Sequence, residues 1–93
     1  MKYMVDKTVF PHTLRIMKKD CVDYNPGKFS IIYGDWLRSN VGYGYVDLFG
    51  RGIQPFHIWM IRFVKEECRI QFKSKKDAMK FKLAWQGKEL IFN

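Results

Sequence analysis

The stretch that decides the fold is I-W-M-I-R-F-V at residues 58–64, followed after Lys65-Glu66-Glu67 by C-R-I-Q-F-K at residues 68–73. The second run alternates apolar and polar residues, which is typical of a half-buried strand, and the polar residues between the runs suit a turn. The two runs therefore predict an antiparallel hairpin. Because successive side chains of a strand point to opposite faces, one set faces the core. That inward set is Trp59, Ile61, Phe63, Cys68, Ile70 and Phe72.

A helix follows the hairpin. Ser74 and Asp77 have the S-x-x-D spacing of a capping box, which predicts a helix over roughly residues 75–86 that ends at Gly87. K-E-L-I-F at residues 88–92 then returns as a last edge strand. The buried stripe of this helix is expected to consist of Ala78, Phe81 and Trp85, with Met79 and Leu83 beside it.

Asn25-Pro26 is a good start for an earlier helix, because asparagine caps well and proline suits the first helical position. Asn40 and Gly42 supply its end. Its apolar face has the spacing i, i+3, i+4, i+7, i+8 and comprises Phe29, Ile32, Tyr33, Trp36 and Leu37. An alternative that the sequence leaves open is a strand over residues 28–33 with a shorter helix after it.

Two further strands complete the predicted fold. Residues 12–19 alternate around Leu14 and Ile16, although a helical turn is the competing interpretation, and residues 43–49 form a strand that ends at Gly50-Arg51-Gly52. The element order is then β-α-β-β-β-α-β. It predicts an α+β fold with a four- or five-stranded, mainly antiparallel sheet and two helices on one face. The length of 93 residues fits one domain over residues 1–93.

Composition narrows the class of protein. With 47% hydrophobic residues the chain can build a packed core, and the polar N-terminus and the lack of a long apolar run predict a soluble, intracellular protein with no membrane partner. Its two cysteines, Cys21 and Cys68, suit free thiols in a reducing cytosol, with a disulfide between them as the alternative. Neither His12 nor His57 completes a zinc-binding spacing with them. No metal and no cofactor are therefore expected.

The catalytic motifs that we sought do not occur. The chain has no phosphate-binding glycine loop and no nucleophile elbow, and its one adjacent carboxylate pair, Glu66-Glu67, lies in the predicted turn. We therefore expect a binding protein and not an enzyme.

The net charge of +8 points to an anionic partner. Residues 1–61 carry eight bases and five acids, a balance of +3, whereas residues 62–93 carry nine bases and four acids, a balance of +5. Nucleic acid, an acidic protein surface and anionic lipid all fit such a balance.

The strand alternation predicts where this charge lies. If Ile70 and Phe72 point inward, the side chains on the opposite face of the sheet mix cations with aromatic rings. These outward residues are Arg69, Gln71 and Lys73, with Arg62, Ile58 and Met60 on the neighbouring strand and Tyr43, Tyr45 and Phe49 on the strand that buries Val46 and Leu48. The helix after Ser74 adds Lys75, Lys76, Lys80 and Lys82. The alternatives are that the N-terminal segment or a second copy covers this face, and that the lysines are simply solvated.

Two resemblances concern origin and role. G-Y-G-Y-V-D-L at residues 42–48 resembles the RNA-contacting strand of RNA recognition motif domains, which implies base stacking on Tyr43 and Tyr45. It departs from that pattern at Val41, where a base is expected, and at Leu48, where an aromatic residue is expected. The run I-Q-F-K-S-K-K-D-A-M-K-F-K-L-A-W at residues 70–85 resembles the ending of small tailed-phage proteins, which implies a phage accessory protein in a bacterial cytoplasm.

Together these features predict a small, non-catalytic binding module. Its expected partner is nucleic acid or a nucleoprotein, bound by Tyr43, Tyr45, Arg62, Arg69 and Lys73 together with Lys75, Lys76 and Lys80. The alternative is an inhibitor or adaptor, such as an anti-defence factor, that binds an acidic surface of a host protein.

Overall fold

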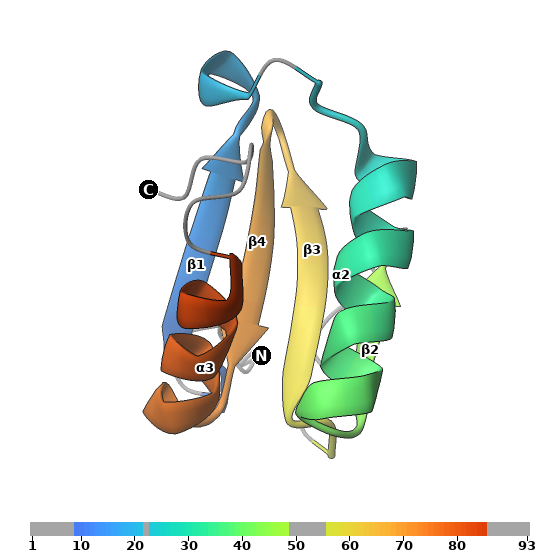
Figure 1. Ribbon diagram of the computed structural model, residues 1–93. Coiled ribbons are helices and arrows are strands. Elements are labelled where there is room, and N and C mark those ends of the chain that lie inside the picture. Colours follow the sequence, from blue (N-terminus) through green and yellow to red (C-terminus); the bar gives the residue numbers. More distant parts are fainter. Residues whose placement is uncertain (1–8, 22, 49–55, 86–93) are drawn as a thin grey trace, which may run out of the picture.

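The computed structural model describes residues 9–21, 23–48 and 56–85, which form a four-stranded sheet and two long helices (Figure 1). In chain order the elements are β1 (His12–Met17), a short 3-10 helix η1 (Lys18–Asp20), α2 (Pro26–Asn40), β2 (Gly44–Asp47), β3 (Trp59–Val64), β4 (Glu67–Phe72) and α3 (Lys75–Trp85). The predicted α+β class and the element order as far as α3 are confirmed. The last predicted strand, at residues 88–92, lies outside the described residues.

The strand order across the sheet is β1-β4-β3-β2. β4 pairs antiparallel with both β1 and β3, as the hairpin pattern predicts, whereas β2 pairs parallel with β3. The sheet is thus mainly antiparallel with one parallel edge pair. The hairpin turn is tighter than predicted, because Glu67 already belongs to β4 and Lys65 adopts a positive φ of 54°.

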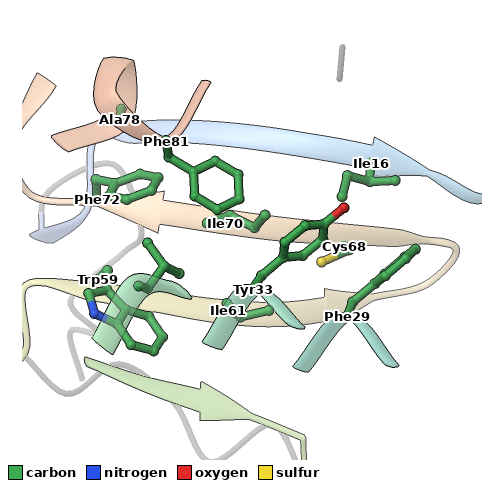
Figure 2. Close-up of a cluster of buried hydrophobic side chains, with 11 residues drawn as sticks. Ile16, Phe29, Tyr33, Trp59, Ile61, Cys68, Ile70, Phe72, Ala78 and Phe81 are labelled. Atoms are coloured by element: carbon green, nitrogen blue, oxygen red, sulfur yellow. The ribbon is translucent and has the colours of Figure 1, made fainter. Parts of the chain in front are cut away.

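Both helices cover the same face of the sheet, α2 over β2 and β3 and α3 over β1 and β4 (Figure 1). Figure 2 shows Phe29 and Tyr33 of α2 and Phe81 of α3 pointing at the strand residues beneath them. All of the predicted inward residues of β3 and β4 pack in this cluster, Phe63 at its margin. The face assignment of the hairpin is therefore correct. The cluster consists of Ile16, Phe29, Tyr33, Leu37, Trp59, Ile61, Cys68, Ile70, Phe72, Ala78 and Phe81.

The two predicted helix starts are confirmed by their hydrogen bonds. The side-chain oxygen of Asn25 accepts from the backbone N–H of Lys28 at 3.1 Å, and Pro26 is the first residue of α2. The hydroxyl of Ser74 accepts from the backbone N–H groups of Lys76 and Asp77 at 3.1 and 3.4 Å. Because α2 is helical from its first residue, the alternative strand over residues 28–33 is wrong.

Several apolar residues lie elsewhere than the sequence predicts. Ile32 is on the rim of α2 and is exposed, and Leu48 follows the end of β2 and is exposed as well. Ile58 precedes β3, so the strand alternation does not reach it, and it packs against the main cluster instead of the opposite face. Met79 and Leu83 point away from the sheet on α3.

Both described cysteines are free, Cys68 in the core and Cys21 at its margin. Burial raises the pKa of the Cys68 thiol and of the Tyr33 hydroxyl above their ordinary values of 9.0 and 10.0, because the charged forms would lose their hydration. A raised pKa means that the folded protein holds these protons more tightly than the unfolded chain does.

We therefore expect stability to be full below about pH 9 and to fall as the pH rises above it, by up to about 1.4 kcal/mol per pH unit for each of the two groups. Urea unfolding measured between pH 7.5 and 11 tests this. The Tyr33→Phe variant should lose less stability above pH 10 than the wild type. Parallel pH curves for the two proteins would contradict the assignment.

Candidate functional site

The face of the sheet turned away from α2 and α3, called the outer face below, carries a row of three arginines. Arg15 of β1 is the register partner of Arg69 of β4, and Arg69 is the partner of Arg62 of β3. Arg62 in turn lies opposite Asp47 at the edge strand β2. Residues in register on neighbouring strands are about 5 Å apart, so the three guanidinium groups share one small area. Arg15, Arg62 and Arg69 are called the arginine row.

Two carboxylates lie along this row. Glu67 Oε2 lies 3.7 Å from the Arg15 Nε and also accepts from the Arg69 Nε. Asp47 is buried beside Arg62. Three positive and two negative side chains leave an excess of one positive charge. Like charges directly opposite each other destabilise a sheet, so packing alone does not account for this arrangement.

An aromatic group lies further along the outer face, with Tyr45 one row and Tyr43 two rows from the arginine row. The Tyr43 ring is 73% exposed and stacks on the His57 imidazole, with centroids 4.7 Å apart and planes 8° from parallel. Tyr45 contacts the same imidazole at 4.8 Å but is half-buried, and its hydroxyl donates to the Met60 sulfur at 3.6 Å. Of the two predicted stacking residues, only Tyr43 offers an open ring.

The glycines of the G-Y-G-Y segment have a packing role. A Cβ at Gly44 would overlap the indole of Trp59, and the Gly42 carbonyl accepts from the Trp59 Nε1 at 2.8 Å. Gly42 also has a φ of 139°, which favours glycine. Packing against Trp59 thus explains why glycines occupy positions 42 and 44. It does not explain why the outward residues between and after them are tyrosines.

The middle of the outer face is covered. Val9, Phe10 and Met60 form a second, small buried cluster, with Tyr45 packed against it. Gln71, the register partner of Met60, is also buried. The interpretation in which the N-terminal segment covers this face is therefore correct for the middle row.

The predicted cations do not form one surface. Lys73 follows the end of β4, and its ammonium lies 6.0 Å from the Phe10 ring. Gln71 lies between Lys73 and Arg69, so Lys73 is separated from the arginine row. Lys75 and Lys76 are exposed at the start of α3, on the opposite side of the sheet. The Lys80 ammonium donates to the Asn40 carbonyl at the end of α2 at 2.5 Å. The helix lysines therefore belong to a different side of the molecule from Arg62 and Arg69.

Sequence reasoning missed three members of this site: Arg15, Glu67 and His57. Arg15 could have been found, because burying Leu14 and Ile16 turns it outward. Its place beside Arg69 depends on the β1–β4 register, which no local pattern gives.

No metal-binding cluster and no membrane-spanning helix is found in the described part of the chain. It contains no group of three His, Cys, Asp or Glu side chains placed to bind a metal. Neither α2 nor α3 has the length and apolar character needed to cross a membrane, and the same holds for any other helix within those residues. Comparison of the chain with protein-family models, with curated proteins and with solved structures finds no match.

Proposed function

We propose that the protein is a small, non-catalytic module that binds nucleic acid through its outer sheet face. The observation that carries this proposal is the arginine row, in which three guanidinium groups on three adjacent strands retain an excess of positive charge. Guanidinium groups bind phosphate through two parallel hydrogen bonds.

The aromatic group supplies the second contact that such a ligand needs. Tyr43 lies four residues before Asp47, the β2 residue opposite Arg62, which is about 13 Å along the strand direction at 3.3 Å per residue. A short single strand can span this distance with its phosphates on the arginines and one base on the open face of Tyr43. Base–aromatic stacking contributes about 1–3 kcal/mol and tolerates any base.

The resemblance of residues 70–85 to tailed-phage proteins would place this binding in an infected bacterium. That assignment of origin remains a prediction.

Binding of labelled single- and double-stranded DNA and RNA, followed by fluorescence anisotropy at about 50 mM salt, tests the proposal. Charge reversal at Arg15, whose side chain is half exposed, is expected to weaken binding on the order of 10-fold for all sequences. It should also lower the salt slope by about 1, because one phosphate contact is lost. Lys82→Glu, on the exposed side of α3, makes the same change of net charge and serves as the control.

Two results would count against the proposal. If Arg15→Glu and Lys82→Glu weaken binding equally, net charge matters and the outer face does not. If no oligonucleotide binds at this salt concentration, the nucleic-acid function is lost.

A second candidate function rests on the other side of the molecule. There Lys75 and Lys76 lie on the same helix as the exposed apolar side chains Met79 and Leu83. Lysines around exposed apolar residues suit an acidic protein surface better than a phosphate backbone. An inhibitor or adaptor of a host protein would use this side of α3, and pull-down that resists salt and nuclease would favour it.

A further inference from the structure

Gln71 is a buried amide without a hydrogen-bond partner among the described residues. It is the residue before the last in β4, lies on the outer face and is 1% exposed, and neither its Nε2 nor its Oε1 makes a hydrogen bond to a described residue. Burying a polar group without a partner is unfavourable, and an apolar residue of similar size would be more stable at this place. The core therefore gives no reason for a glutamine here.

Phe10 packs against the neighbours of this amide. Phe10 packs with Met60, the register partner of Gln71, and the Lys73 ammonium lies 6.0 Å from its ring. Because Met60 lies opposite Gln71 and Lys73 lies two residues beyond it, we infer from these two contacts that the Phe10 ring lies over the amide. This cover belongs to the small cluster of Val9, Phe10 and Met60, which is much smaller than the cluster beneath the helices.

We infer that Phe10 is a displaceable cover and that Gln71 beneath it recognises an unpaired nucleobase. This inference rests on the proposed nucleic-acid function and names the part of the ligand that the site reads. A carboxamide presents one donor group and one acceptor side by side, which matches the edge of a base that carries the same pair, such as N6 and N7 of adenine. A base that replaces the flat Phe10 ring keeps the apolar contact with Met60 and satisfies the amide as well.

The surroundings of Gln71 fit such a ligand. Arg69 lies two residues before Gln71 on the same face of β4, and Lys73 lies two residues after it, just past the end of the strand. A phosphate on either side of the bound base would therefore meet a cation. Tyr45, in the row of Gln71 and Met60, supplies an aromatic wall.

Three variants test the inference: Gln71→Met, Phe10→Ala and the double variant. Gln71→Met is expected to raise the Tm of the free protein and to weaken binding of a single-stranded oligonucleotide several-fold. It should leave binding of an abasic oligonucleotide of the same length unchanged. Phe10→Ala is expected to strengthen binding of the base-containing strand about 5- to 10-fold, and the double variant should show no such gain.

If Phe10→Ala folds poorly, the inference can still be tested by NMR on the wild-type protein. The side-chain NH₂ signals of Gln71, identified in an NMR spectrum by their loss in Gln71→Met, should shift when the base-containing strand is added and stay in place with the abasic strand.

The possible failures are distinguishable. If the wild type binds both strands equally and Gln71→Met changes neither affinity, Gln71 is not a recognition residue, whereas the phosphate-binding function stands. If neither strand binds the wild type or Phe10→Ala, both proposals are overturned.

Discussion

The Gly44→Ala variant is expected to lose about 3–5 kcal/mol of folding stability, at the upper end of what overpacking costs. The added Cβ would overlap the Trp59 indole, and this indole cannot move aside. It is fully buried, and its Nε1 is hydrogen-bonded to the Gly42 carbonyl. Since small domains are stable by only about 5–15 kcal/mol, urea unfolding should show a large shift of the midpoint.

Gly27→Ala is the matched control. Gly27 lies in the first turn of α2, where a Cβ would meet only the Asn25 side-chain oxygen at an ordinary distance of 3.5 Å. Alanine there should be neutral or should stabilise the helix by up to about 1 kcal/mol. If Gly44→Ala is as stable as Gly27→Ala, Trp59 does not pack on β2, and the spacing of the G-Y-G-Y segment needs a reason other than packing.

Features set by local sequence could be predicted. The alternation of Cys68, Ile70 and Phe72 gave the correct face of β4, and Asn25 and Ser74 marked the two helix starts, because both signals act within a few residues. The parallel pairing of β2 with β3 could not be predicted in this way. Strand direction depends on the path of the connection between two strands, and the alternation within β2 is the same in either direction.

The candidate site shows the same limit. Arg62 and Arg69 were placed together because they occupy matching positions of one hairpin. The addition of Arg15 to this pair and the packing of Phe10 against Met60 both depend on segments about 50–55 residues away along the chain. The helix lysines were grouped with the arginines by charge alone, and the sheet itself separates the two sets.

Phe81→Ala is expected to cost about 3–5 kcal/mol, the usual range for a buried phenylalanine. Phe81 is fully buried where α3 meets α2 and the sheet (Figure 2). Its ring centroid lies 5.5–6.1 Å from those of four other aromatic residues: Tyr33, Trp36, Phe72 and Trp85. Truncation would leave a cavity among rigid rings that cannot collapse into it. Trp85, which the sequence placed in the same buried stripe, is half-buried, so its truncation should cost less.

Leu83→Ala is the control that separates the loss of core packing in Phe81→Ala from a change in helix propensity. Leu83 is on the same helix but 64% exposed, and its truncation should change stability by less than about 0.5 kcal/mol. Unfolding of both variants in guanidinium chloride, with unchanged m-values, gives the comparison. A loss below about 1 kcal/mol for Phe81→Ala, or an equal loss for Leu83→Ala, would mean that α3 presents a different face to the sheet. A different face would mean that α3 is rotated about its axis. The positions of its lysines relative to the arginine row would then differ from those described above.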